Sequence, residues 1–242
     1  MRTFGLVGKD IDYSFSRNYF SKKFSKNNID ARYINFDLKS IDQFPEIFKT
    51  TEISGLNVTI PYKEKVIPFL DHLDPEAQKI SAVNTIKISK NGELTGYNTD
   101  HFGFKKSLEN HLESFHSSAL ILGTGGASKA VAYALDKLSV PYQFISRNSS
   151  ENTLSYSELS VEVIKRNNLV INTTPLGTSP ETERYPAIPL EGISSQHIIF
   201  DLIYNPEETR LMKLASERGA KTLNGYRMLE LQAEKSWSIW NS

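Results

Sequence analysis

The sequence predicts an α/β protein made of two α/β domains, the second of them built on a parallel sheet. Short apolar runs alternate with helical patterns along most of the chain. A glycine-rich turn at residues 123–128 separates an apolar run from an Ala-rich amphipathic stretch. The length of 242 residues accommodates two modest domains, each with its own core.

The first hundred residues show the alternation of strands and helices. Tyr19, Phe20 and Phe24 give the stretch after Ser16 an apolar helical face. Lys90-Asn-Gly92, between two strand-like runs, predicts a β-hairpin. The expected strands are residues 3–7, 32–38, 55–60, 82–88 and 93–97, and the expected helices are residues 41–48, 61–70 (with proline at its start) and 102–112.

The glycine-rich turn follows the apolar run 118–122 and precedes a helical pattern that continues to residue 138. Gly123 can adopt a positive φ, and Gly125 has no Cβ to keep a phosphate at a distance. Free N–H groups at the start of the following helix favour an anion. The unit therefore predicts a Rossmann-like dinucleotide site, in which Ser128 replaces the third glycine and is small enough for close packing. The alternative is a glycine turn in an ordinary α/β domain that binds no nucleotide.

A second strand of this unit, residues 142–146, follows at βαβ spacing and ends at Arg147. A dinucleotide fold places the residue that meets the adenosine ribose at about this position. An acidic residue there favours NAD, whereas arginine indicates a 2′-phosphate and hence NADP.

The remainder of the chain continues the α/β pattern. A strand begins at residue 169, and residues 197–204 form another buried strand. The expected helix 207–218 has acid at its start and base at its end, as the helix dipole favours, and Gly219 ends it. The last stretch, residues 225–240, is expected to form a helix with a core-facing stripe. Its apolar residues are Met228, Leu229, Leu231, Trp237 and Trp240.

The composition excludes several classes of function. Acidic and basic residues balance at 28 each, which argues against a nucleic-acid binder and favours a small-molecule partner. The absence of cysteine excludes disulfides and a cysteine nucleophile, and fits a reducing compartment. No apolar run approaches the roughly 20 residues that span a bilayer, so we expect a cytoplasmic protein without membrane contact. The five histidines show no metal-ligand grouping beyond His111 and His116, which do not predict a metal site.

Polar residues sit at strand and turn ends, where open α/β sheets bind ligands. Asn57, Thr59 and Lys63 span the junction between an expected strand and an expected helix, and Asn84 and Asp100 lie near the hairpin.

Each candidate also has a purely structural interpretation. Ser14 and Ser16 fit turn and N-cap positions, Asp100 fits a helix cap, and Lys63 fits a solvated surface lysine. Gln232 on the last helix fits a solvated position.

Taken together, these segments resemble the shikimate dehydrogenase family in order and spacing. The resemblance rests on residues 55–63, 82–85 and 96–100, followed by the glycine loop, and runs nearly end to end. Residues 172–177 and 201–206 are similar to further signatures of the family.

The resemblance implies a catalytic pair, Lys63 and Asp100. It implies a substrate-binding domain of residues 1–100 with 226–242, and an NADP-binding domain of residues 101–225. The implied substrate-binding residues are Ser14 and Ser16, which hold a carboxylate in this family, with Asn57, Thr59, Asn84, Tyr204 and Gln232. The implied cofactor-binding residues are Gly123, Gly125, Gly126, Ala127, Arg147, Thr173, Leu202 and Gly225.

The implied activity is the reversible NADPH-dependent reduction of 3-dehydroshikimate to shikimate, in the pathway to chorismate and the aromatic amino acids, by a monomer or homodimer. Two alternatives stay open: a quinate/shikimate dehydrogenase that uses NAD, and a non-catalytic ligand sensor. The sequence departs from the family pattern at Asp10, where proline is usual, and at Tyr13, where histidine is usual. It also lacks the second basic residue that commonly follows Arg147 in the NADP-binding turn.

Overall fold

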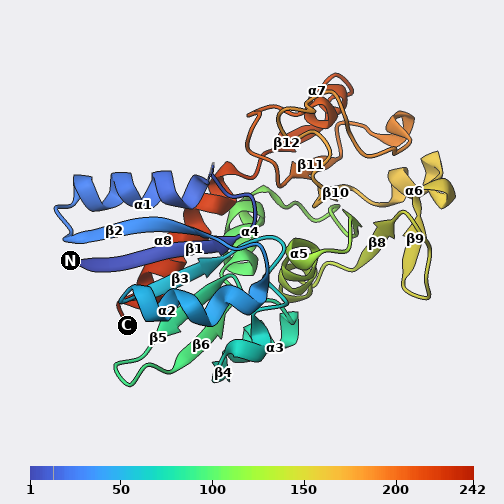
Figure 1. The fold of residues 1–242 in the computed structure, drawn as a ribbon. Helices are drawn as coiled ribbons and strands as arrows, with labels where there is room; N and C mark the ends of the chain where they lie inside the picture. The colour runs from blue at the N-terminus through green and yellow to red at the C-terminus, as the bar shows by residue number, and fades with distance from the viewer. Residues whose placement is uncertain (13) are drawn as a thin grey trace. The chain divides into compact units, whose positions relative to one another are not determined.

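The computed structural model describes residues 1–12 and 14–242 and divides the chain into two compact units (Figure 1). The first unit comprises Met1–Gly103 with Leu229–Ser242, and the second comprises Phe104–Met228. The predicted fold class, two α/β domains with a parallel sheet in the second, is confirmed. In the described part of the chain, no helix is both long enough and apolar enough to cross a membrane.

The first unit contains a mixed six-stranded sheet in the order β2-β1-β3-β5-β6-β4. The pairs β1–β2, β1–β3 and β4–β6 are parallel, whereas β3–β5 and β5–β6 are antiparallel. The β5–β6 pair is the predicted hairpin, and Gly92 in its turn has φ +86°. The strands are β1 (Arg2–Gly8), β2 (Ala31–Asp37), β3 (Gly55–Val58), β4 (His72–Leu73), β5 (Thr85–Ile88) and β6 (Leu94–Tyr97).

Both faces of this sheet are buried, because β1 is apolar on each side. Phe4 and Leu6 pack with α1 (Phe15–Lys26) and α8 (Tyr226–Trp240), whereas Val7 packs into the opposite core. That second core contains the 3₁₀ helix η1 (Ile41–Glu46) and α2 (Ile47–Thr50) (Figure 1). Burial of large apolar side chains on both faces holds the layers together, and the strand ends stay open for polar residues.

The second unit contains six parallel strands in the order β12-β11-β10-β7-β8-β9. The chain starts in the middle, winds outward through β8 and β9, and then returns to build the other half. A doubly wound sheet of this order binds ligands at the carboxyl ends of the two central strands, here β7 and β10. The strands are β7 (Ala119–Leu122), β8 (Tyr142–Ser146), β9 (Thr153–Ser155), β10 (Leu169–Asn172), β11 (Ile198–Asp201) and β12 (Lys221–Leu223).

Helices cover both faces of this second sheet. The alternation along β7 places Ala119 and Ile121 in one core and Leu120 and Leu122 in the other. The first core includes residues of α4 (Asp100–Leu108) and α5 (Gly126–Lys137), and the second includes residues of α6 (Val161–Arg166) and α7 (Arg210–Ser216).

The expected helix at residues 61–70 is wrong. The strand before it stops at Val58, and only the 3₁₀ helix η2 (Ile67–Phe69) forms within the range. Contacts with residues distant in sequence stabilise this segment instead. The Lys63 carbonyl accepts a hydrogen bond from the Val83 amide at 2.8 Å, and the Tyr62 hydroxyl donates to the Leu38 carbonyl at 2.6 Å.

Other elements start later than expected or were not expected. Helix α7 begins at Arg210, because the Thr209 side chain caps it, so Glu207 and Glu208 precede the helix. Residues 102–112 divide into the end of α4 and the 3₁₀ helix η3 (Glu109–His111). The elements that the sequence pattern did not indicate are short: β4, α3 (Pro75–Ile80), β9, η4 (Tyr156–Glu158), α6, η5 (Leu190–Gly192) and β12.

Candidate functional site

The first unit brings Lys63 and Asp100 into a partly buried ion pair. The Lys63 Nζ lies 2.7 Å from Asp100 Oδ2, and the side chains are 15% and 7% exposed. Asp100 is the first residue of α4, and its backbone amide donates to Asn98 Oδ1 at 3.0 Å, so the start of the helix fixes the carboxylate. Lys63 lies in the turn at residues 61–66, which forms in place of the first part of the expected helix 61–70.

Asn84 supports this pair from the segment before β5. Its Nδ2 donates to Asp100 Oδ1 at 2.8 Å, while its Oδ1 accepts from the Thr99 amide at 2.7 Å. Gln232 on α8 joins the same group, with its Oε1 3.4 Å from Asn84 Nδ2. Four predicted site residues from four segments of the chain thus form one cluster: Lys63, Asp100, Asn84 and Gln232.

Asn57 on β3 connects this cluster to the middle of the sheet. Its Nδ2 donates to the Asn84 carbonyl at 3.1 Å and to Ser236 Oγ at 3.1 Å, and its Oδ1 accepts from the Tyr33 hydroxyl at 2.8 Å. Ser236 also lies 2.7 Å from Thr85 Oγ1.

Sequence reasoning did not identify Ser236 or Tyr33 as site residues. Ser236 follows Gln232 by four positions, so both lie on one face of α8, and this spacing was the available signal. Tyr33 lies on the apolar face of β2, and nothing local distinguishes it from a core tyrosine.

The two candidate serines lie at the start of α1. Ser14 is the N-cap, and its Oγ accepts from the Arg17 amide at 3.0 Å, so the structural interpretation of Ser14 as a helix cap is confirmed. The cap uses the oxygen as an acceptor and leaves the hydroxyl proton available for a ligand. Ser16 is half-buried in the first turn of α1, and Thr59 is half-buried directly after β3. Tyr13 lies outside the described residues.

In the second unit, the glycine loop joins the central strand β7 to α5. Gly123 has φ +107°, and a Cβ at this position would lie 2.8 Å from Thr173 Oγ1. Gly125 is the N-cap of α5 without a side-chain cap, and the space around its Cα is open. Gly126 and Ala127 form the first turn of the helix, so amide groups there can meet an anion.

Three further predicted residues lie at the ends of neighbouring strands. Thr173 follows β10, and its Oγ1 donates to the Leu122 carbonyl at 2.6 Å. Leu202 follows β11, and its amide donates to the Asn172 carbonyl at 3.0 Å. Gly225 is pressed against Leu202, because a Cβ there would lie 2.0 Å from the Leu202 oxygen. The glycine loop, Thr173 and Leu202 therefore share the carboxyl edge of this sheet.

The remaining two predicted residues of this unit follow strands β8 and β11. Arg147 is exposed directly after β8, and Tyr204 is half-buried after β11.

A buried carboxylate links the loops after β10 and β11. Asp201 accepts from Asn172 Nδ2 at 3.0 Å, from the Ile203 amide at 3.1 Å and from Thr209 Oγ1 at 2.7 Å. Burial raises the pKa of Asp201 to about 6, although the three hydrogen bonds counteract it. Because Asn172 Oδ1 in turn accepts from the Thr174 amide at 3.0 Å, Asp201 fixes the turn that carries Thr173.

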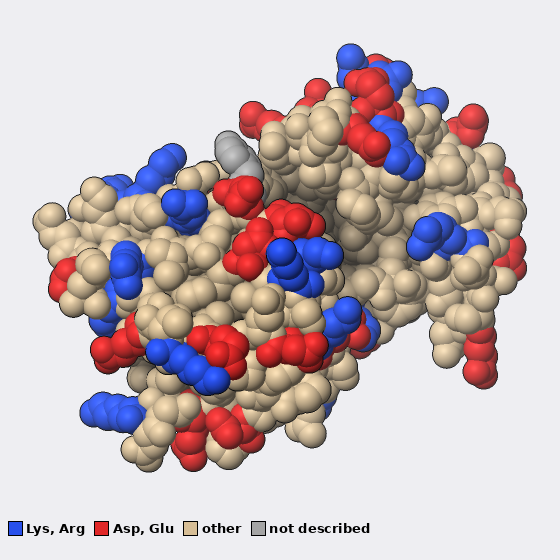
Figure 2. All heavy atoms as spheres, viewed as in Figure 1, with Lys and Arg blue, Asp and Glu red and all other residues tan. Residues whose placement is uncertain are grey.

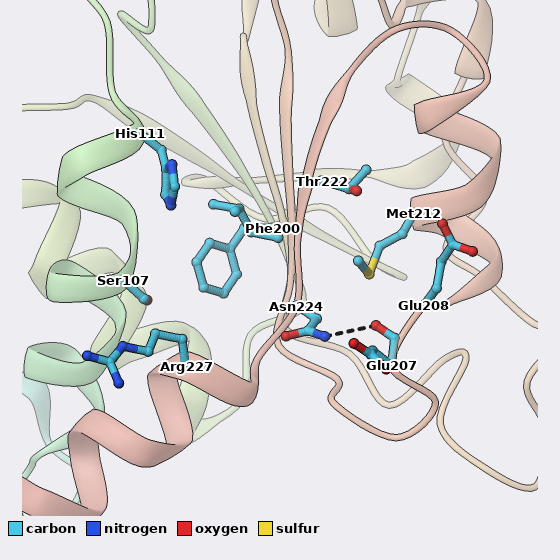
Figure 3. Close-up of a pocket in the computed structure, with 10 residues that line it drawn as sticks. Ser107, His111, Phe200, Glu207, Glu208, Met212, Thr222, Asn224 and Arg227 are labelled. Atoms are coloured by element: carbon cyan, nitrogen blue, oxygen red, sulfur yellow. Dashed lines mark hydrogen bonds between the residues drawn. The ribbon is translucent and has the colours of Figure 1, made fainter.

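The second unit also has an open cavity of about 460 Å³. Figure 3 shows His111 and Arg227 on one side of it and Met212 and Glu208 on the other, with the Phe200 ring between them. The other lining residues are Ser107, Glu207, Thr222, Leu223 and Asn224. None of the predicted site residues lines this cavity.

Comparison with known proteins identifies relatives over nearly the whole chain. A family model described as the shikimate dehydrogenase substrate binding domain matches residues 6–86. The shikimate dehydrogenase (NADP(+)) of Methanococcus vannielii is 36% identical, and the match covers 98% of this chain and 90% of the relative.

Solved structures give the same relationship. Shikimate dehydrogenase from Aquifex aeolicus is 34% identical with a TM-score of 0.89, and the match covers 100% of this chain and 92% of that one. The Thermus thermophilus enzyme in complex with NADP(H) and shikimate is 28% identical with a TM-score of 0.88, covering 99% and 93% of the two chains.

Proposed function

Because the chain belongs to the shikimate dehydrogenase family, we propose that it catalyses the reversible NADPH-dependent reduction of 3-dehydroshikimate to shikimate. The observation that carries this proposal is the Lys63–Asp100 pair, at 2.7 Å and held by Asn84, on the unit whose sequence matches the substrate-binding family model. In this assignment the first unit binds the substrate and the second binds the cofactor.

The second unit has the features that a dinucleotide requires. Gly123 adopts a positive φ in the turn, and Gly125 leaves open space that a side chain would fill. Helix α5 begins without a side-chain cap, so its amide groups are suited to a pyrophosphate. The residues that would hold NADPH are these glycines with Gly126, Ala127, Thr173, Leu202, Gly225 and Arg147. When bound, NADPH supplies the hydride.

Lys63 has the geometry of the acid that completes the reduction. Hydride delivery to a carbonyl carbon leaves an oxygen that needs a proton, and a charged lysine can donate it. The Asp100 carboxylate accepts a hydrogen bond from the amine at 2.7 Å and holds it in place. In the reverse direction the same amine accepts the proton from the substrate hydroxyl.

The substrate-binding assignment divides the polar residues by their chemistry. The hydroxyl groups of Ser14 and Ser16 donate hydrogen bonds to the substrate carboxylate. Asn57, Thr59, Asn84 and Gln232 bind the ring hydroxyls, because amide and hydroxyl groups match neutral polar partners. Tyr204, on the second unit, stays a predicted substrate-binding residue.

Arg147 is assigned to the 2′-phosphate of NADP. Its exposure directly after β8 suits a ligand at the ribose position, and a guanidinium binds phosphate through charge-assisted hydrogen bonds. A second candidate, a quinate/shikimate dehydrogenase that uses NAD, is favoured by one observation: no second basic residue accompanies Arg147 within residues 148–151.

The proposal of an enzyme competes with that of a ligand sensor. A sensor needs the binding residues but not a proton donor, so the intact Lys63–Asp100 pair favours an enzyme.

Cytoplasmic location, the absence of nucleic-acid binding and a monomeric or dimeric state stay predictions. On the face shown in Figure 2, acidic and basic side chains are interspersed over both units.

A spectrophotometric assay of cofactor reduction tests the proposal. We expect turnover of shikimate with NADP, and slower turnover when quinate replaces shikimate or NAD replaces NADP. Equal or faster turnover with quinate and NAD would support the second candidate. Shikimate binding without turnover with either cofactor would support the sensor.

A further inference from the structure

The chain that leaves β1 toward α1 is anchored on the end of β2. The carboxylate of Asp37, the last residue of β2, accepts hydrogen bonds from two successive backbone amides, that of Asp10 at 3.0 Å and that of Ile11 at 3.2 Å. The Asn35 side-chain amide donates to the Ile11 carbonyl at 2.6 Å. Asn35 and Asp37 are two positions apart on one strand, so their side chains share a face. The residues at the end of β2 therefore hold both backbone polar groups of Ile11.

The Ile11 side chain is fixed as well. It is buried and belongs to the core that contains residues of α1 and α8. A Cβ on Gly8, the last residue of β1, would lie 2.7 Å from Ile11 Cγ2 and 2.6 Å from Thr59 Cγ2, so both side chains pack closely against this glycine. Ile11 is thus held at the carboxyl end of β1, between contacts from β2 and from the residue that follows β3.

The backbone of Asp10 has a conformation that suits this anchor. Its φ is +56°, in the left-handed region, which aspartate tolerates better than most residues do. Proline could not replace it, because proline has φ near −65° and lacks the N–H that donates to Asp37. The segment therefore requires a residue with a free amide and access to positive φ at position 10.

We infer that Asp37 is a positioning residue for the carboxylate end of the substrate site: it fixes residues 9–12 and, through them, the place of Ser14 at the start of α1. Ser14 follows Ile11 by three positions and is buried, and its Oγ accepts from the Arg17 amide, so its hydroxyl proton can go to a carboxylate. This inference rests on the proposed function, which assigns Ser14 to the substrate carboxylate. Asp37 acts through the backbone of residues 9–12 and not on the substrate itself.

The variant Asp37→Ala tests the inference, because it removes the acceptor of both amides. We expect the KM for shikimate, and the Kd measured by calorimetry, to rise roughly threefold to tenfold, the size of one net hydrogen bond. The kcat and the KM for NADP should stay unchanged. Asp71→Ala is the matched control, because Asp71 is also an exposed carboxylate that accepts from a backbone amide, that of Leu94 on β6 at 2.7 Å, near the opposite edge of the same sheet.

Two variants at position 10 separate the backbone from the side chain. Asp10→Pro loses the amide donor and excludes positive φ, so it should raise the shikimate Kd at least as much as Asp37→Ala does. Asp10→Asn keeps the amide and tolerates the left-handed region, so it should keep the wild-type Kd. An equal rise in both variants would assign the effect to the Asp10 side chain and overturn the inference.

A double-mutant cycle separates positioning of the serine from a general effect on the fold. In a Ser14→Ala background, Asp37→Ala should add almost nothing to the shikimate Kd, whereas in a Gln232→Ala background it should keep its full effect. An unchanged Kd in Asp37→Ala, the same added loss in both backgrounds, or a similar rise in Asp71→Ala would each overturn the inference.

The inference and the proposed function fail in different ways. A wild-type protein that binds shikimate but does not oxidise it contradicts the proposed reaction, while the calorimetric cycle still tests Asp37. A wild-type protein that does not bind shikimate contradicts both.

Discussion

The two units build their candidate sites from different materials. In the first unit, the site consists of side chains. Hydrogen bonds of 2.7–3.1 Å join Lys63, Asp100, Asn84 and Asn57. In the second, the site is mostly backbone, shaped by glycines and by strand ends. A substrate with distinct hydroxyls requires specific donors and acceptors, whereas a pyrophosphate is satisfied by amide groups and space. The comparison predicts that single side-chain changes damage the first site more than the second.

The largest effect is expected for Lys63→Ala, which tests the side-chain site directly. Loss of the proton donor should lower kcat by about 10²–10⁴-fold while shikimate still binds. The measurement is steady-state turnover with shikimate and NADP, together with calorimetric binding of shikimate. Exposed Lys65, two residues away, provides the control Lys65→Ala. Near-normal kcat in a folded Lys63→Ala protein would contradict the assigned role.

Asp201 tests whether a single side chain also controls the stability of the second unit. Its folded pKa of about 6 lies above the ordinary value of 3.8, so the folded protein holds this proton more tightly than the unfolded chain. Stability should therefore fall as pH rises from about 4 to about 6, by roughly 3 kcal/mol at most. Above that range the penalty is complete.

The neutral variant Asp201→Asn checks this pH dependence. Denaturant unfolding between pH 4 and pH 7, compared for wild type and variant, should show the wild type losing stability relative to the variant as pH rises. Parallel stability curves would mean that Asp201 ionises normally.

Arg147 is the one side chain that we assign to cofactor selection in the otherwise backbone-built site. A charge-assisted contact contributes about 1.5–3 kcal/mol, so Arg147→Ala should weaken NADP binding about tenfold to a hundredfold and hardly change NAD binding. Fluorescence titration with both reduced cofactors measures the two affinities. Equal losses for both would assign Arg147 to the shared part of the cofactor or to the fold.

The smallest effect concerns the backbone itself. Gly123→Ala adds a Cβ at φ +107°, 2.8 Å from Thr173 Oγ1, and should cost about 1–2 kcal/mol of stability. Gly125→Ala, with φ −82° and open space, should leave stability almost unchanged. Thermal unfolding of both variants makes the comparison. Equal destabilisation of the two variants would contradict the expected difference between Gly123 and Gly125.

Local pattern was sufficient where a structure depends on neighbours in sequence. The strand at residues 142–146, the hairpin around Gly92 and the turn before α5 were all predicted, because alternation, turn residues and glycine conformation act within a few positions. The pairing of Lys63 with Asp100 was expected from the family resemblance and not from any local rule.

Tertiary structure decided what depends on distant partners. Residues 61–66 form a turn in place of the expected helix, and the hydrogen bond from the Val83 amide to the Lys63 carbonyl, 20 positions apart, stabilises it. The Ser236 hydroxyl meets Asn57 over 179 positions of sequence, and the Tyr33 hydroxyl meets it from β2, which β1 separates from β3 in the sheet. Polar side chains on apolar faces are ambiguous in sequence, since only the folded sheet and helix show which buried donor meets which buried acceptor.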